Sequence, residues 1–484
     1  MKKNRKKHHI VIVGAGISGI GAAYRLQTKC PNKEITIFEG RDAIGGTWDL
    51  FKYPGIRSDS DMYTFGFPFQ PWKNPKAIAD GPDILKYIKD TAEEHNIRKK
   101  IKFNRRVISS SWSTKTTTWH LEIKNTKTDC IEHVECNFLY MCSGYYDYKN
   151  GYTPEFPAIN TFEGTVVHPQ KWDTTLNYTD KNIVIVGSGA TAVTLVPILA
   201  EKAKKVTMLQ RSPTYIVNLP SKDVIANFLK KTLPDKTAYS ISRWKNILST
   251  IAFYKASQKW PKTIKKFLKS RIKKTLGDTY KDQHFNPKYG PWDQRLCAVP
   301  DNNFFNSLKK GKATIVTDTI KTFTKKGLLL TSGNQLDADI IITATGLKIQ
   351  MFGGMKLLID NQQIDVSKLH AYKGVMLSNL PNFAVAIGYT NSSWTLKCDL
   401  NSLFVTKLLN YMDANNYSVC TPKFDAINMQ TERLLDFDAG YVLRANKILP
   451  KQGSKAPWKV YQNYIKDIFS LKYGKVKDNY LEYT

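Results

Sequence analysis

The 484-residue sequence predicts an α/β fold with two Rossmann-like dinucleotide-binding domains and an inserted helical subdomain. Three observations lead to this prediction. A buried strand, a glycine turn and a helix follow one another in residues 9–26, and the same pattern returns in residues 181–199. A lysine-rich stretch with apolar residues at helical spacing then interrupts the α/β rhythm.

The first glycine turn has the spacing of a dinucleotide-binding loop. Gly14 permits the tight turn, Gly16 allows a pyrophosphate to approach the backbone, and Gly19 lets the helix pack on its strand. The following helix presents free N–H groups to phosphates. Glu39 ends the next strand, residues 35–39, about twenty residues further on, where a carboxylate can bind both ribose hydroxyls.

The second turn repeats the design with a different residue after its strand. Gly187, Gly189 and Ala192 occupy the three small-residue positions, and residues 205–212 form the following strand. Gln210 stands at the acidic position and Arg211 follows it, a pair that favours the 2′-phosphate of NADPH over NADH. The alternative is that Arg211 is an incidental surface residue.

A ribose acid in the first unit and an arginine in the second predict FAD followed by NADPH, with electrons passing from nicotinamide to flavin. Metal ligands are not expected, because the seven cysteines form no C-x-x-C pair and no histidine cluster has ligand spacing. The expected FAD domain comprises residues 1–150 and 347–484, the NADPH domain comprises 151–220 and 291–346, and the helical insertion comprises 221–290.

The insertion is strongly basic. Residues 221–282 hold sixteen Lys or Arg against four Asp, within a chain of formal net charge +31. A packed helix with a solvated face is the ordinary explanation, and binding to a membrane surface or a partner is the alternative. No zinc-finger or RNA-recognition motif supports nucleic-acid binding. No apolar stretch is long enough to span a bilayer, so we expect a cytoplasmic protein, with peripheral membrane association as the alternative.

The remaining segments complete the expected fold. Residues 311–320 and 327–333 suggest short antiparallel strands, and 337–346 a buried strand. Residues 382–409 suggest a strand, a polar turn that could face the flavin, and a long helix. The lysine-rich residues 471–484 suggest a tail.

Two longer motifs carry a family resemblance. FEGTVVHPQKWD places Phe162, Gly164, His168, Trp172 and Asp173 at fixed spacing, and GGTWDLFKYPGIRSD does so for Gly45, Gly46, Trp48, Tyr53, Pro54, Gly55 and Asp59. With both glycine turns, these segments resemble the Baeyer–Villiger monooxygenases, class B flavoproteins related to the flavin-containing monooxygenases. The similarity runs nearly end to end and is strongest to the ethionamide-activating branch of that family.

The resemblance implies roles for individual residues. Arg295 is expected to stabilise negative charge that develops during oxygen transfer, with Asp59 as its carboxylate partner, whereas His168 is expected to anchor a linker between domains. Many relatives carry lysine where this chain has Gln294, which leaves more of the NADPH selectivity to Arg211. The cofactor-binding residues expected are Gly14, Gly16, Ser18, Gly19, Glu39, Thr47, Trp48, Asp49, Leu50, Arg57, Ser58, Asp59 and Val107 for FAD, and Gly187, Ser188, Gly189, Ala190, Thr191, Ala192, Gln210 and Arg211 for NADPH.

The implied reaction uses NADPH and O₂ to convert small apolar ketones to esters or lactones, with S-oxidation of thioethers or thioamides as a side activity. Two alternatives remain. A flavin monooxygenase that acts mainly on sulfur or nitrogen would share the cofactor sites, and a non-enzymatic flavoprotein or membrane-bound redox module would fit the basic insertion. The sequence does not indicate the oligomeric state.

Overall fold

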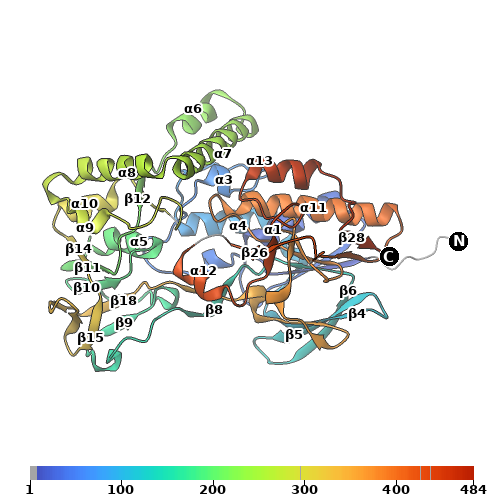
Figure 1. Ribbon diagram of the computed structural model, residues 1–484, viewed down its shortest axis with the longest axis horizontal. Helices are drawn as coiled ribbons and strands as arrows, with labels where there is room; N and C mark the ends of the chain where they lie inside the picture. The colour runs from blue at the N-terminus through green and yellow to red at the C-terminus, as the bar shows by residue number, and fades with distance from the viewer. Residues whose placement is uncertain (1–7, 295, 426, 436–437) are drawn as a thin grey trace.

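Two parallel β-sheets form the centres of the two lobes of the molecule (Figure 1). The computed structural model describes residues 8–294, 296–425, 427–435 and 438–484. The predicted α/β class is confirmed, because in each parallel sheet a central strand leads through a glycine turn into a helix that packs on the sheet. Arg295, the expected catalytic arginine, lies outside the described residues.

The first lobe contains a parallel sheet of strand order β24-β7-β1-β2-β3. Side chains alternate across β1, so that Ile10 and Ile12 pack toward helices α1 and α11, whereas Val11 and Val13 pack toward a second sheet. The second sheet contains β4, β5 and β6, whose Trp112 and Trp119 are buried against the first. The bounds are β1 His9–Val13, α1 Ile17–Lys29, β2 Glu34–Phe38, α4 Gly81–Glu94, β3 Ile101–Lys102, β4 Arg105–Ser113, β5 Thr118–Asn125, β6 Ile131–Cys136, β7 Phe138–Met141, β20 Lys356–Ile359, β21 Gln362–Gln363, β24 Phe383–Val385 and α11 Trp394–Ala414.

The second lobe contains a parallel sheet of order β14-β11-β10-β18-β9. Ile183 and Ile185 of β10 face helix α5, while Val184 and Val186 face the small antiparallel sheet β15-β16-β17. The expectation for residues 311–320 was wrong in part, because β14 pairs in parallel with the distant β11 and only β15 pairs antiparallel with β16. The bounds are β9 Thr165–Val167, β10 Asn182–Val186, α5 Ala190–Leu199, β11 Lys205–Gln210, α10 Asn303–Lys309, β14 Ala313–Thr317, β15 Ile320–Thr324, β16 Gly327–Leu330, β17 Gln335–Asp337 and β18 Ile340–Thr343.

The chain crosses between the lobes along two paired strands. Strand β8, Tyr146–Gly151, leads into the second lobe, and β19, Leu347–Ile349, returns to the first. The two strands pair antiparallel, with Leu347 opposite Gly151. After the return, β24 joins β7 at the edge of the first sheet, so the first lobe is assembled from both ends of the chain.

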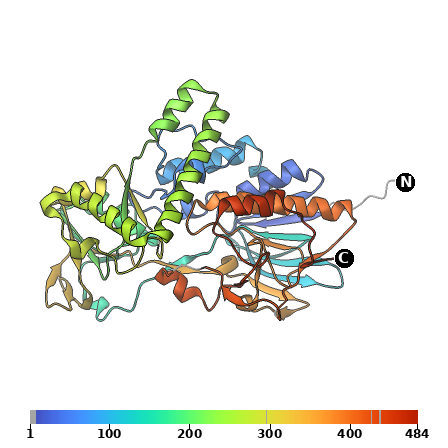
Figure 2. The ribbon, with the colours of Figure 1, turned by 45° about the horizontal axis from the view of Figure 1, so that its top comes forward.

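The basic insertion forms four helices, which lie along one edge of the molecule (Figure 1). Helices α6 and α7 form a hairpin that rises away from both sheets (Figure 2). The base of α7 contacts helix α3, Met62–Phe65, of the first lobe, where Arg243 donates hydrogen bonds to the carbonyls of Tyr63 and Gly66 at 2.6 and 2.8 Å. The bounds are α6 Val224–Thr232, α7 Asp235–Lys259, α8 Pro261–Leu276 and α9 Asp282–Phe285, flanked by β12 Ile216–Leu219 and β13 Cys297–Pro300.

The C-terminal residues are folded, so the expectation of a tail over 471–484 was wrong. Strand β28, Leu481–Tyr483, pairs antiparallel with β25, Cys420–Pro422, and Leu471, Val476 and Leu481 are buried while the lysines face outward. Helix α12, Gly440–Ala445, and helix α13, Tyr464–Asp467, precede this strand. Among the described residues, no helix has the length and apolar character needed to cross a membrane.

Candidate active site

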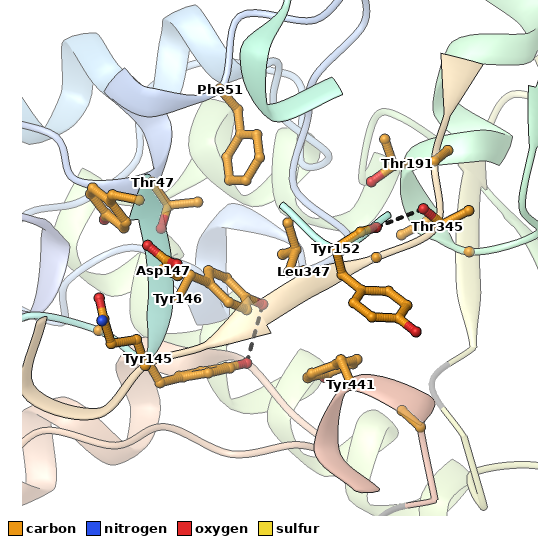
Figure 3. A pocket seen from close by; sticks show the side chains of 18 of the residues that line it. Thr47, Phe51, Tyr145, Tyr146, Asp147, Tyr152, Thr191, Thr345, Leu347 and Tyr441 are labelled. Carbon is orange, nitrogen blue, oxygen red and sulfur yellow. Dashed lines mark hydrogen bonds between the residues drawn. The ribbon is translucent and has the colours of Figure 1, made fainter. Parts of the chain in front are cut away.

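A single large cavity of about 1130 Å³ runs between the two lobes and reaches both glycine turns. Gly14 and Gly16 line one end, Gly187 and Gly189 line another, and residues of β8 and β19 lie between them. Figure 3 shows aromatic and hydroxyl side chains from both lobes pointing into this space. The cavity therefore joins the two regions that the sequence identified as nucleotide sites.

The first glycine turn is tightly packed. Gly14 adopts φ +104°, a conformation that favours glycine, and its N–H donates to the Phe38 carbonyl at 2.8 Å. A Cβ on Gly19 would lie 1.9 Å from the Gly14 carbonyl oxygen, so this position accepts no side chain. Gly19 does not line the cavity, as its expected packing role requires. Helix α1 starts after Gly16 without a side-chain cap, which leaves its first N–H groups available to an anion.

Glu39 lies where a ribose acid is expected, and its carboxylate is fixed by the backbone. One oxygen accepts from the N–H of Ala15 at 2.8 Å and the other from the N–H of Arg41 at 2.9 Å. Burial raises the pKa of the carboxyl, while these two backbone hydrogen bonds oppose the rise. Because each oxygen has a second lone pair, both remain able to accept from sugar hydroxyls.

The loop that follows places some of the expected residues on the cavity and others behind it. Thr47 and Trp48 line the cavity. Asp49 and Leu50 do not line it, and the Asp49 carboxylate instead forms an ion pair with Arg41 at 2.6 Å. Their expected contacts with FAD stay predictions, since neither residue lies on the cavity surface. The ion pair between Asp49 and Arg41 fixes the loop on the side away from the cavity.

Ser18 connects helix α1 to the start of helix α11. Its hydroxyl accepts from the Trp394 indole N–H at 2.9 Å, and both residues line the cavity. The polar turn of residues 386–393, expected to face the flavin, does not line the cavity. A Cβ on Gly388 would lie 2.4 Å from the Trp394 ring, so this ring covers the turn on that side.

Asp59 forms an ion pair with Arg57, two residues away. The Arg57 guanidinium lies 3.1 Å from the Asp59 carboxylate and donates to the Ala298 carbonyl at 2.6 Å. The expected partnership of Asp59 with Arg295 falls outside the described residues. Arg57, Ser58, Asp59 and Val107 all line the cavity, and their contacts with FAD stay predictions.

The Tyr53–Gly55 part of the same motif contacts the other lobe. The Tyr53 hydroxyl forms a hydrogen bond with Thr191 at the start of α5, and burial raises the Tyr53 pKa to about 12. Gly55 adopts φ +75°, and a Cβ there would lie 2.6 Å from Ile198 of α5. This motif is therefore a contact between the lobes as well as part of the cavity wall.

The second glycine turn shares the backbone of the first but is open. Gly187 adopts φ +134°, and a Cβ there would lie 2.3 Å from the Ala344 carbonyl oxygen. A Cβ on Gly189 would meet no described atom within 4 Å, so the space in front of this turn is free. Ser188, Ala190 and Thr191 line the cavity, whereas Ala192 is buried behind it. Helix α5 also begins without a side-chain cap.

Gln210 and Arg211 have different positions. Gln210 is 1% exposed, and its amide donates to the His284 carbonyl at 3.0 Å and to the Thr317 hydroxyl at 2.9 Å. It does not line the cavity, so the expected contact with coenzyme is not supported by its position; Gln210 joins β11 to α9 and β14. Arg211 is exposed and lines the cavity, and the Ser188 hydroxyl donates to the carbonyl of the next residue, Ser212, at 3.1 Å.

His168 of the FEGTVVHPQKWD motif joins the two linker strands. Its Nδ1 accepts from the N–H of Gln170 at 3.1 Å, and its Nε2 lies 3.2 Å from the carbonyl of Gly346 beside β19. A Cβ on Gly151 of β8 would lie 1.9 Å from the His168 ring, so the ring occupies the space where a side chain at this position would lie. Burial lowers the pKa of His168, which favours the neutral ring with its proton on Nε2. His168 does not line the cavity.

The sequence analysis missed an aromatic group on the cavity wall. Tyr145 and Tyr146 follow β7, and their hydroxyls lie 3.2 Å apart (Figure 3). Their position at the carboxyl end of a parallel strand is a signal that could have identified them. Tyr441 and Arg444 come from α12, and the Arg444 guanidinium lies 3.4 Å from the centre of the Tyr152 ring. No motif marks these two in the sequence.

Comparison with known proteins gives one family. The flavin-binding monooxygenase-like family matches residues 6–413. The chain is 52% identical to the FAD-containing monooxygenase EthA of Mycobacterium tuberculosis strain H37Rv over 98% of this chain and 97% of that protein. It is 46% identical to the probable FAD-binding monooxygenase AlmA of Acinetobacter baylyi, over 99% and 96% of the two chains.

Solved structures agree with the fold. A steroid monooxygenase bound to NADP aligns with a TM-score of 0.77 at 20% identity, over 99% of each chain. The structure of OTEMO in complex with FAD and NADP aligns with a TM-score of 0.75 at 20% identity, over 99% of this chain and 100% of that one. From the match over residues 6–413 and the end-to-end identity to curated relatives, the chain belongs to the flavin-binding monooxygenase-like family.

Proposed function

We propose that this protein is an FAD-containing, NADPH- and O₂-dependent monooxygenase of Baeyer–Villiger type that converts apolar ketones to esters or lactones. One observation carries the proposal: a single cavity connects a glycine turn with a ribose acid to a glycine turn with an exposed arginine. The overall change is ketone plus O₂, NADPH and H⁺ to ester, NADP⁺ and water. The relatives named for FAD and the two Baeyer–Villiger motifs support the same assignment.

The residues present fit the two nucleotides. The uncapped N-termini of α1 and α5 offer N–H groups to each pyrophosphate, and Glu39 offers free lone pairs to a ribose. The open space at Gly189 admits a phosphate close to the backbone. When bound, FAD accepts a hydride from NADPH and activates O₂ for transfer of one oxygen atom to the substrate. In this proposal, residues 1–150 with 347–484 bind FAD, and 151–220 with 291–346 bind NADPH.

Charge on the cavity wall supports the oxygen-transfer step. Negative charge that develops near the substrate carbonyl is stabilised most by a fixed cation in a site that excludes water. We assign this role to Arg295. Arg57 and Asp59 form an ion pair on the cavity wall. The hydrogen bond from Arg57 to Ala298 joins this pair to the strand that begins two residues after Arg295.

Aromatic side chains support an apolar substrate. Phe51, Tyr146, Leu347 and Tyr441 lie around the same part of the cavity (Figure 3). The faces of such rings bind apolar groups by excluding water and by dispersion. Thioethers and thioamides are also apolar and would enter the same space, so S-oxidation is the proposed side activity.

The test is product formation by FAD-loaded enzyme given linear, cyclic and aryl ketones or matched thioethers, with NADPH consumption and mass-spectrometric detection. We expect ketone-dependent NADPH oxidation and an ester or lactone product. A larger kcat/KM for thioethers than for every ketone would instead assign the enzyme to sulfur oxygenation. NADPH oxidation that no substrate stimulates would contradict a monooxygenase function.

Arg295→Ala tests the catalytic assignment. Loss of one charge stabiliser costs about 2.7–4 kcal/mol, so ester formation should fall at least about a hundredfold. The NADPH that is still oxidised should then reduce O₂ to hydrogen peroxide. FAD binding should persist. Arg295→Lys should not restore full activity, because an ammonium cannot reproduce the planar guanidinium. Normal ester yield in Arg295→Ala would mean that the arginine has no catalytic role.

A further inference from the structure

The helical insertion presents an unusual concentration of exposed apolar side chains. Of the fifteen large apolar residues that are exposed in the described part of the chain, eight lie between residues 224 and 267. They are 44% to 78% exposed. The helices that carry most of them lie along one edge of the molecule (Figure 1). Single exposed apolar residues are ordinary, whereas interaction surfaces concentrate such residues in one region of the fold.

Helix α6 contributes Val224, Ile225 and Phe228 to this surface. The helix is fixed in place by Asp223, whose carboxylate accepts from the N–H of Ala226 and forms an ion pair with Lys245 of α7 at 2.5 Å. The three apolar side chains therefore stand on a hairpin that this ion pair holds together and that rises away from both sheets (Figure 2).

Helix α7 carries apolar side chains on its exposed face as well as on its buried face, where Tyr239 and Ile247 lie. Ile241, Trp244 and Leu248 are exposed, whereas Ser242 and Arg243 are buried. The Arg243 guanidinium donates to three backbone carbonyls of residues 63–66, at 2.6 to 3.3 Å. Rotation of α7 that covered Trp244 would break these charge-assisted hydrogen bonds inside the protein, so the apolar stripe is held outward.

Helix α8 and Trp260, the residue that joins it to α7, add aromatic rings next to basic groups. Trp260 and Phe267 are exposed, with the Lys259 ammonium 4.9 Å from the Trp260 ring and the Arg271 guanidinium 5.7 Å from the Phe267 ring. Aromatic rings beside lysine and arginine are typical of surfaces that enter the boundary between lipid headgroups and acyl chains.

We propose that the exposed apolar side chains of α6, α7 and α8 form a docking surface for an anionic lipid bilayer. Charge selects this occupant. Residues 221–282 hold sixteen Lys or Arg against four Asp, so a second copy of the chain would be repelled while an anionic headgroup layer attracts. The apolar side chains then enter the bilayer surface without any helix crossing it. Ketones with long apolar chains concentrate in the same layer, which places the enzyme beside its substrates.

The experiment uses full-length, FAD-loaded enzyme in flotation with vesicles of phosphatidylcholine alone or mixed with phosphatidylglycerol, over a range of NaCl concentrations. The net charge of +31 alone would attract the protein to anionic vesicles, so the decisive measurement is binding that survives salt. We expect wild type to stay bound to anionic vesicles in salt. The triple variant Phe228→Ser, Trp244→Ser, Leu248→Ser should lose on the order of a hundredfold in partitioning.

The matched control is Ile131→Ser, which removes an exposed apolar side chain from β6 in the other lobe and should bind as wild type does. Flavin absorbance and the thermal midpoint verify that each variant is folded. Because binding needs no turnover, the result is independent of the catalytic proposal. Equal salt-resistant binding by the triple variant would overturn the docking surface.

Insertion can be measured directly. Brominated phospholipid in the vesicles should quench the fluorescence of wild type, and the variant Trp244→Phe, Trp260→Phe should bind equally but lose most of that quenching. Quenching that is unchanged in this variant would contradict the proposal. So would salt-resistant binding to polyglutamate in place of vesicles, because it would identify an acidic polypeptide as the partner.

Discussion

The two glycine turns share a backbone design but differ in how closely the chain surrounds them. At the first turn, a Cβ on Gly16 would already contact Gly46 at 3.5 Å, and Glu39 is 7% exposed. At the second turn, a Cβ on Gly189 would meet nothing within 4 Å, and Arg211 is exposed. The first site is enclosed and the second is open to exchange.

This difference matches the uses proposed for the two nucleotides. A cofactor that stays with the protein through many turnovers gains from an enclosed site, because ordered contacts on all sides slow its release. A coenzyme that must leave after each turnover needs an open site with one strong recognition contact. Enclosure distinguishes the two turns more clearly than the glycine pattern does.

The largest expected effect tests the packing of the first turn. Gly19→Ala places a methyl group 1.9 Å from the Gly14 carbonyl oxygen and should destabilise the protein by about 3 kcal/mol or more. We expect loss of bound flavin and a lower thermal midpoint, measured by absorbance and calorimetry. The second turn serves as the comparison, because its equivalent position already carries an alanine, Ala192, and therefore accepts a methyl group. Retention of full yellow colour and stability would mean that the first turn is not enclosed.

The next effect concerns recognition at the second turn. Arg211→Ala should lower kcat/KM for NADPH roughly ten- to a hundredfold, since one charge-assisted contact contributes about 1.5–3 kcal/mol. The value for NADH should change little, and the flavin content should not change. Steady-state kinetics with both coenzymes measures this. If wild type used the two coenzymes equally well, and the variant did too, Arg211 would have no role in selectivity.

Gln210→Ala tests whether Gln210 has a structural role that differs from the proposed coenzyme-binding role of its neighbour Arg211. Loss of Gln210 leaves the His284 carbonyl and the Thr317 hydroxyl without their amide partner, at a cost of about 1–3 kcal/mol of stability. The ratio of NADPH to NADH efficiency should stay as in wild type, because Gln210 does not line the cavity. A changed ratio with an unchanged thermal midpoint would reverse this interpretation.

The smallest effect is expected at the junction between the two regions. Burial lowers the pKa of His168 from its ordinary value of 6.5, so its contribution to stability is complete above about pH 6.5 and is lost as the pH falls through the folded-state value. Protonation at Nδ1 removes the hydrogen bond from Gln170, worth about 1 kcal/mol.

The measurement is the difference in thermal midpoint between wild type and His168→Gln at pH 8 and pH 5. It should shrink toward pH 5. The double difference isolates His168 from the other histidines whose pKa is lowered by burial, among them His284 and His370. A difference that is constant with pH would mean that His168 does not titrate between the lobes.

The strands and helices around the glycine turns could be predicted because their pattern is local. Each buried strand is a continuous apolar run followed by small residues, and the structure places β1, α1, β10 and α5 where these patterns stand. Strand β14 was misjudged because its partner, β11, lies about a hundred residues earlier in the chain. The C-terminal residues were misjudged because lysines hid the few buried side chains, such as Leu481, that fix them.

The candidate site was predictable where a motif implies a backbone geometry, and less so where side chains meet. Glycine spacing identified Gly14 and Gly187 because their φ values require glycine. Position in a motif did not reveal that Asp49 turns toward Arg41, or that Gln210 is buried, since both depend on neighbours elsewhere in the fold. Tyr441 reaches the cavity only because α12 packs near the returning strand β19.

The return of the chain along β19 also decides which lobe can be completed first on the ribosome. The second lobe is contiguous in sequence between β8 and β19, whereas the first awaits β24, the edge partner of β7, and α11, which packs beside α1. During synthesis, the apolar face of α1 and the unpaired edge of β7 stay uncovered until the C-terminal segment emerges. The lobe that is begun first is therefore the last to close, and it needs protection from aggregation for most of translation.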